Sequence, residues 1–509
     1  MTNKSTEDNV ATETEVVAEE PKTKKPKDPH TVVNIYGDVT AVDVTSKRFE
    51  RSTTLPSGAG EDIVRFTKKV DEVDNPNLVK EYSEEELISV GYNTANIKSV
   101  YTDGPLASKV PADGYVNHPT ADGKKLGMRF VEPAAKGHLS GADAVAAFTS
   151  KLSIGKHASI TLWHSGFTLL LAPPKESDII NLQYNISKQE HRLGMDTNNM
   201  IYSNYGVVAN KLILDFIMRH VVASSLVLPD DKSYLDFILA SDINQLEMAM
   251  LGCMRSGTYP LTMTCGNSLD LDADDKPVCD FTASLDIDPE NTIWVRREAL
   301  STDLLVHISK TSAGSHTAES VLEYQAKLEQ NTMKTYTVGS GDREITVDIK
   351  TPTARKYLDS GTLWVNRVIA DTEAILSTDD DVDMRENKLA VMINASLLNR
   401  YSSYVERIST GAAYVDDIPT IIDVLATLSS DTDVVNDMYE AINDYINTSY
   451  ISLVATYNFD CPKCRKAGRK QAYTDGEVTG FKEFIPVNVA EHFFAHSALI
   501  MAEVVDRDQ

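Results

Sequence analysis

The sequence predicts an α+β protein made of two similar, mostly helical modules, each ending in a zinc-ribbon-like β-hairpin. Three observations lead to this fold class. Long stretches place apolar residues three and four positions apart, which is typical of helices. Shorter stretches that alternate between apolar and polar residues, bounded by turn residues, are typical of strands. A strand, a proline, helices and a cysteine-bearing hairpin follow one another in this order twice along the chain.

Length and composition favour a globular chain with more than one domain. Its 509 residues exceed what one hydrophobic core usually supports. A net charge of −26 repels nucleic acid and anionic lipid, although a local basic patch can still bind either. We expect neither a signal peptide nor a membrane span, because no apolar run is long enough. Five cysteines are an odd number for a disulfide framework, which favours a reducing compartment.

The first 138 residues divide into two predicted segments. Residues 1–30 are rich in Thr, Glu, Lys and Pro, so we predict a disordered acidic arm. Residues 31–138 carry the turn signals "LPSGAG", "TDGPL", "PADG" and "TADG", which predict a loop-rich region with extended or β elements.

The first helical module is predicted at residues 139–335. It begins with a short helix at 139–152, and "ASITLWHSGFTLLLAPP" predicts a hairpin that turns at Ser165 and Gly166. Four helical stretches follow: "KESDIINLQYNISKQEHRLG", "GVVANKLILDFIMRHVVA", "SYLDFILA" and "INQLEMAMLGCM". The module ends in a degenerate ribbon hairpin around two cysteines, Cys265 and Cys279.

The second module is predicted at residues 336–509 and ends in a CxxC hairpin. "ITVDIKTPTARKYL" can be laid over "FTLLLAPPKESDII", and "ATYNFDCPKC" over "GTYPLTMTCG". Repeated landmarks in one order favour a duplication. Helix–helix–hairpin is also a common succession, so an unrelated pair of α+β domains stays open as an alternative.

The cysteines allow three arrangements. A zinc ribbon places one cysteine pair on each of two turns. Cys461 and Cys464 have the knuckle spacing, whereas Cys265 and Cys279 are separated by thirteen residues, as if one cysteine remained from each of two knuckles. In the arrangement we favour, both hairpins are eroded ribbons without metal. In the second, Cys461 and Cys464 bind zinc with His492 and His496. In the third, the two hairpins meet and all four cysteines share one site. Zinc is therefore possible but not favoured, and we predict less than one tightly bound zinc per chain.

Two further groups of residues are candidates for partner contacts. A basic loop follows the knuckle and would suit an acidic surface or a phosphate backbone; it contains Lys463, Arg465, Lys466, Arg469 and Lys470. The other group is aromatic, at the exits of the two hairpins, and its members are candidate interface anchors: Trp294, Phe493 and Phe494. A solvated loop and core packing, respectively, are the more common roles of such residues, and we favour them over partner contacts.

Signatures of enzymes are missing from the sequence. There is no phosphate-binding loop, "HFFAH" lacks the glutamate of a zincin, and "HSG" does not form a nucleophile elbow. The acidic stretches "DLDADD" and "DDDVD" lack the glycine and the glutamate of a calcium loop. We therefore predict a protein that is not an enzyme.

The order of "SITLWHSGFTLLLAPP", helices, "YNFDCPKC", "FKEFIPVN" and "HFF" resembles the baseplate hub family of T-even-like contractile-tailed bacteriophages. The resemblance covers residues 140–509. The chain departs from the family pattern by its doubled unit, its lost second knuckle and its acidic front end. The resemblance implies a non-catalytic virion protein, made in the host cytoplasm and built into the tail baseplate with other tail proteins. A large symmetric assembly is expected, with no membrane and no nucleic acid as partners.

A second function class remains open. The CPKC knuckle and its basic loop are also typical of an intracellular zinc-ribbon adaptor or a nucleic-acid-associated factor, although the net charge of −26 opposes this interpretation.

Overall fold

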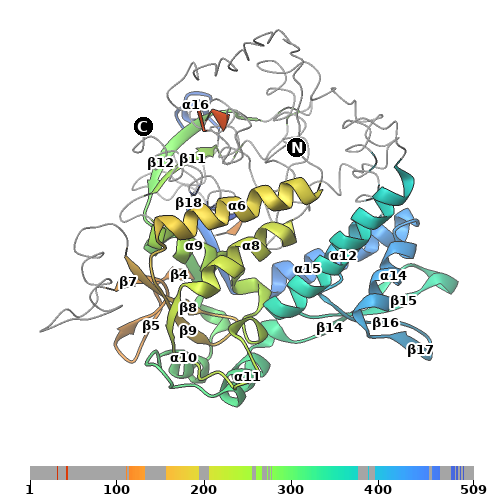
Figure 1. Ribbon diagram of the computed structural model, residues 1–509, viewed down its shortest axis with the longest axis horizontal. Coiled ribbons are helices and arrows are strands. Elements are labelled where there is room, and N and C mark those ends of the chain that lie inside the picture. Colours follow the sequence, from red (N-terminus) through yellow and green to blue (C-terminus); the bar gives the residue numbers. More distant parts are fainter. Residues whose placement is uncertain are drawn as a thin grey trace, which may run out of the picture.

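In the computed structural model of the protein, helices and sheets surround a shared core (Figure 1). The structure describes residues 31–32, 42–43, 110–111, 114–131, 156–193, 206–254, 259–265, 267, 272, 276, 278–376, 388, 392, 396–457, 461–469, 483–487, 489–490, 493 and 497. The predicted arm at 1–30 and the predicted helix at 139–152 lie outside these residues. No helix in this described part of the chain is both long and apolar enough to cross a membrane.

The first sheet contains the predicted hairpin. Its four antiparallel strands have the order β10–β9–β8–β7 and are β7 (Arg129–Val131), β8 (His157–Leu162), β9 (Phe167–Leu171) and β10 (Val221–Ser224). The turn between β8 and β9 ends at Gly166, whose φ is +85°. Glycine adopts this left-handed conformation at little cost, so the predicted turn is confirmed.

Three helices follow one another outward from this sheet: α9 (Ile243–Met254) packs on β8 and β9, α8 (Gly206–Arg219) packs on α9, and α6 (Glu176–Leu193) packs on α8. Helix α9 is buried along almost its whole length and contacts both β8 and a later strand, β18 (Ser452–Tyr457). Its buried residues include the polar Gln245 and Glu247 as well as the apolar side chains. Helix α9 therefore lies between the first sheet and β18 (Figure 1).

The second sheet has the strand order β14–β15–β16–β17. Its strands are β14 (Lys334–Val338), β15 (Ile345–Ile349), β16 (Val405–Thr410) and β17 (Ala413–Val415). Its helices are α12 (Ala354–Ile375), α14 (Ile418–Leu428) and α15 (Thr432–Ser449). Helix α12 also packs on α8, at a point where Gly361 faces Val207 without room for a Cβ atom.

A third sheet joins segments from both predicted modules and from the region before them. Its order is β3–β19–β18–β13–β4, formed by β3 (Val110–Pro111), β4 (Tyr115–Asn117), β13 (Ile293–Arg296), β18 (Ser452–Tyr457) and β19 (Glu483–Pro486). Strand β13 belongs to the first predicted module, and β18 and β19 belong to the second. The predicted modules are therefore not separate domains, because they share a sheet and a core.

The remaining elements are short. Strands β11 (Tyr259–Thr264) and β12 (Thr282–Ile287) form a two-stranded hairpin, and helices α10 (Thr302–Ile308) and α11 (Ala318–Lys327) follow β13. Helix α16 (Pro462–Lys466) follows β18. Two further pairs of short strands lie near the beginning of the chain: β1 (Thr31–Val32) with β2 (Val42–Asp43), and β5 (Thr120–Ala121) with β6 (Lys124–Lys125).

Two predicted helices differ from the structure. The helix predicted from "GVVANKLILDFIMRHVVA" ends at Arg219, because the last residues form β10 and pair with β9. The stretch "SYLDFILA" forms only a 3₁₀ turn, Tyr234–Asp236. Beyond this turn the backbone amide of Leu239 donates to Ser165 Oγ at 2.9 Å, and that of Ala240 donates to the Pro352 carbonyl at 2.9 Å. These tertiary hydrogen bonds replace the helical ones.

The two halves share part of their topology. In each, two antiparallel strands are followed by a proline and a helix, and a later strand returns to pair with the second strand: β8, β9 and β10 in one half, β14, β15 and β16 in the other. The later hairpins differ, because β11–β12 forms a sheet of its own whereas β18 and β19 lie inside the third sheet. For the strands and helix that begin each half, the duplication stays a prediction. The different surroundings of the later hairpins argue against a superposition of the two halves over their whole length.

Candidate metal centre

Four of the five cysteines form one buried cluster. The sulfur atoms of Cys265, Cys279, Cys461 and Cys464 all lie within 4.8 Å of one another. The Cys265 and Cys464 sulfurs are 3.7 Å apart, and those of Cys279 and Cys461 are 3.6 Å apart. None of the four residues is more than 2% exposed. The cluster joins segments separated by 182 to 199 positions in the sequence.

The β11–β12 hairpin supplies two of these cysteines. Cys265 directly follows β11, and its amide donates to the Phe281 carbonyl at 2.7 Å, which extends the hairpin ladder by one step. Cys279 lies three residues before β12. Both sulfur atoms therefore lie beyond the same end of the hairpin.

Helix α16 supplies the other two. Cys461 is the N-cap residue and Pro462 occupies the first turn, where a missing amide hydrogen costs nothing. The Cys464 amide points back to the Cys461 sulfur at 3.5 Å. This C-P-x-C turn holds both sulfur atoms on one side. Gly468, with φ of +63°, then lets the chain reverse.

Polar contacts attach the α16 segment to the hairpin around the sulfur atoms. Asn267 Nδ2 donates to Cys464 Sγ at 3.2 Å. Lys463 pairs with Asp280, and the Arg469 guanidinium donates to the Val278 carbonyl. The Lys463 pair is exposed, so it contributes little to stability. These contacts orient the two segments, whereas the buried sulfur atoms form the junction itself.

The thiols of the cluster differ in acidity. Burial raises the pKa of Cys265 and of Cys279. Burial also acts on Cys464, but hydrogen bonds from Asn267 and the neighbouring thiols outweigh it, so its pKa lies below the usual range. A soft metal ion binds cysteines as thiolates, so its binding would displace the protons of the thiols that are still protonated. The four possible ligands are all sulfur atoms and are enclosed by protein, which suits a structural ion or buried thiols and leaves no room for a substrate.

The structure brings the predicted ligands together as the third arrangement requires. Cys461 and Cys464 meet Cys265 and Cys279, so the two cysteine pairs are not two separate eroded ribbons. They are halves of one cluster, because α16 lies at the end of the hairpin (Figure 1). His492 and His496 lie outside the described residues.

The basic loop is exposed where the structure describes it. The side chains of Lys463, Arg465, Lys466 and Arg469 are all exposed, and Lys470 lies outside the described residues. Two of them, Lys463 and Arg469, contact Asp280 and Val278 beside the hairpin. The loop is therefore in part an element that holds the cysteine cluster together.

For the aromatic group the structure favours core packing over the interface interpretation. Phe493 is fully buried and packs edge-on against Phe216. Trp294 is half-buried in β13, where its Nε1 donates to the Ala455 carbonyl at 3.0 Å and its ring packs on Phe484. Phe494 lies outside the described residues. Trp294 lies on the less buried face of β13 and is covered by Phe484, whereas Phe493 is helical and packs into the main core.

A second buried cluster contains a histidine, a serine and an aspartate. Asp242 accepts hydrogen bonds from His164 Nδ1 at 2.8 Å, Ser165 Oγ at 2.6 Å and Gln245 Nε2 at 2.8 Å. The Ile451 amide donates to His164 Nε2 at 3.0 Å, which makes Nε2 the acceptor and Nδ1 the protonated nitrogen.

This arrangement differs from that of a hydrolase triad. Ser165 donates to the carboxylate and not to the histidine, and the histidine nitrogen that would accept its proton is already bonded to a backbone amide. All three residues are fully buried. The cluster therefore ties the β8–β9 turn to α9 and to the start of β18. The "HSG" motif marked the turn, but nothing in the sequence indicated its partner Asp242.

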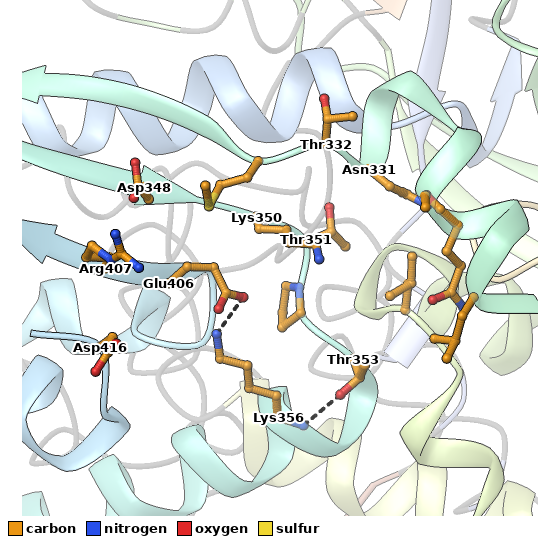
Figure 2. Close-up of a pocket in the computed structure, with 16 residues that line it drawn as sticks. Asn331, Thr332, Asp348, Lys350, Thr351, Thr353, Lys356, Glu406, Arg407 and Asp416 are labelled. Atoms are coloured by element: carbon orange, nitrogen blue, oxygen red, sulfur yellow. Dashed lines mark hydrogen bonds and ion pairs between the residues drawn. The ribbon is translucent and has the colours of Figure 1, made fainter. Parts of the chain in front are cut away.

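The structure also contains a cleft of about 790 Å³ between α11, the start of α12 and one face of the second sheet. Lys356 pairs with Glu406 at 2.8 Å across it (Figure 2). Figure 2 shows Asp348, Arg407 and Asp416 to one side and Asn331 and Thr332 to the other. Three acidic side chains offset three basic ones: Asp348, Glu406 and Asp416 against Lys350, Lys356 and Arg407. This balance favours neither an anionic nor a cationic ligand. No pattern in the sequence indicated the cleft.

Comparison with known proteins adds no family or fold assignment: no family model, curated protein or solved structure matches this chain.

Proposed function

We propose that this chain is a structural component of the baseplate of a contractile bacteriophage tail, and that its activity is assembly with other tail proteins. The proposal rests on the resemblance of residues 140–509 to the baseplate hub family. The chain would be made in the host cytoplasm and incorporated into the virion as part of a large symmetric assembly.

The non-catalytic part of the proposal is supported by how the reactive side chains are used. The four clustered cysteines are enclosed, with no open position for a substrate. The His164, Ser165 and Asp242 side chains serve one another and the backbone. Both clusters connect segments far apart in the sequence. Such connections suit a protein whose task is to keep a fixed shape between neighbours.

Deletion of the gene from the phage that carries it tests the proposal. We expect heads filled with DNA and no completed baseplate, with tails restored by the wild-type gene supplied in trans. Immunogold labelling of purified particles should place the chain at the distal end of the tail. Normal tails without the gene, or label confined to the head, would contradict the proposal.

A zinc-ribbon adaptor or nucleic-acid-associated factor is the alternative, favoured by the exposed basic side chains on and after α16. Arg465→Ala combined with Lys466→Ala discriminates between the two. Phosphate contacts produce binding that weakens steeply with salt. We expect the wild-type chain and the double variant to bind nucleic acid equally poorly at low salt. Salt-sensitive binding that only the wild-type chain shows would favour the alternative.

A further inference from the structure

We propose that Cys265, Cys279, Cys461 and Cys464 bind one Zn²⁺ as a closed tetrahedral thiolate site, and that this ion fastens the β11–β12 hairpin to α16. The proposal concerns the isolated chain and stands whether or not the chain belongs to a baseplate. It reverses the expectation from sequence that favoured hairpins without metal.

The spacing of the sulfur atoms fits the ion. Zinc–sulfur bonds of about 2.3 Å directed to tetrahedral corners place the sulfurs about 3.8 Å apart. The measured distances of 3.7 Å for Cys265–Cys464 and 3.6 Å for Cys279–Cys461 match such an edge. The outer limit of 4.8 Å for the whole set leaves room for one ion between the four sulfurs.

Other uses of four close cysteines fit less well. A disulfide needs sulfur atoms about 2.05 Å apart, and the two closest pairs stand well beyond that. A polynuclear iron–sulfur cluster places several atoms between the thiolates and so needs a wider set. A single tetrahedral ion matches the geometry. Zinc is the ion most often found in closed four-cysteine sites.

Groups around the sulfurs fit a charged centre. Four thiolates and one Zn²⁺ leave a net charge of −2, which hydrogen-bond donors and nearby cations stabilise. Asn267 donates to Cys464 Sγ at 3.2 Å, and the Cys464 amide points to Cys461 Sγ at 3.5 Å. Lys463 and Arg469 are held beside the cluster by Asp280 and by the Val278 carbonyl.

The two fastened segments need such a connection. Within the described residues, β11 and β12 pair only with each other. An isolated two-stranded hairpin is marginally stable in water. Helix α16 has five residues, too few to be stable alone. A cross-link over 182 to 199 positions removes much chain entropy from the unfolded state. The ion therefore supplies the stability that neither segment has.

Elemental analysis of the untagged, purified chain tests the proposal. We expect about one zinc ion per chain in the wild type, as a single tetrahedral site requires. Cys279→Ser, in the hairpin, and Cys461→Ser, in α16, should each lose the ion. Cys253→Ser is the matched control, because Cys253 is equally buried but lies outside the cluster, and it should keep the ion.

Two further measurements keep the test decisive if a variant fails to fold. The wild-type chain exchanged with Co²⁺ should show the intense thiolate-to-cobalt charge transfer and visible bands of a tetrahedral thiolate site. Native alkylation should leave the four cysteines unmodified until a strong chelator is added. Wild-type protein without bound metal, cysteines equally reactive with and without chelator, or disulfides between these residues would overturn the proposal. Stoichiometric iron in place of zinc would overturn the choice of metal.

Discussion

Gly166→Ala tests how the β8–β9 turn is held against α11. An added Cβ atom would lie 2.3, 2.6 and 2.9 Å from three ring carbons of Tyr324, whereas carbon atoms in contact prefer about 3.5–4.0 Å. The ring cannot easily withdraw. Tyr324 is 2% exposed, its hydroxyl donates to the Trp163 carbonyl at 2.7 Å, and its ring lies 4.9 Å from that of His307.

Two costs add in this variant. A left-handed conformation costs a non-glycine residue about 1–2 kcal/mol, and overpacking a core typically costs about 1–3 kcal/mol. We therefore expect Gly166→Ala to lower the free energy of unfolding by about 2–5 kcal/mol, measured from the urea midpoint at unchanged slope. This is a large part of the total stability of a typical domain.

Gly411→Ala is the matched control for the first cost alone. Gly411 has φ of +59° and nothing within 4 Å of the added Cβ atom. We expect this variant to lose only about 1–2 kcal/mol. If Gly166→Ala is no more destabilising than Gly411→Ala, the contact with Tyr324 has no energetic weight and the reasoning fails.

Two more predictions concern buried polar groups. Asp242→Asn should cost about 1–3 kcal/mol of unfolding free energy, because an amide cannot accept all the hydrogen bonds that His164, Ser165 and Gln245 donate to the carboxylate; a thermal midpoint within a degree of wild type would contradict this. Burial, and the neighbouring His307 ring, lower the pKa of His316 from 6.5 to about 4. The unfolded chain then binds the proton more readily, so stability is full above about pH 6.5 and falls by up to roughly 3 kcal/mol toward pH 4. Urea midpoints measured across this pH range should fall toward pH 4 in the wild type and fall less in His316→Gln. An equal dependence on pH in both proteins would exclude His316 as its source.

Local patterns determined much of this fold. Apolar spacing predicted α6 and α9, and the apolar runs around Ser165 and Gly166 predicted the β8–β9 hairpin, because these elements depend on contacts between residues close in the sequence. The knuckle spacing of Cys461 and Cys464 marked a tight turn for the same reason, since Pro462 and the short helix form within a few residues.

The tertiary structure decided which distant segments meet. Cys265 and Cys279 reach Cys461 and Cys464 across nearly 200 positions, and several arrangements of the four residues are compatible with the same local patterns. The same holds for Asp242, which meets the His164 turn only because α9 packs on β8. Burial of Phe493 likewise depends on α8, which lies far away in the sequence. A one-dimensional pattern specifies the face and the turn of an element. The partner of that face is set by packing the whole chain into one core, which no local window contains.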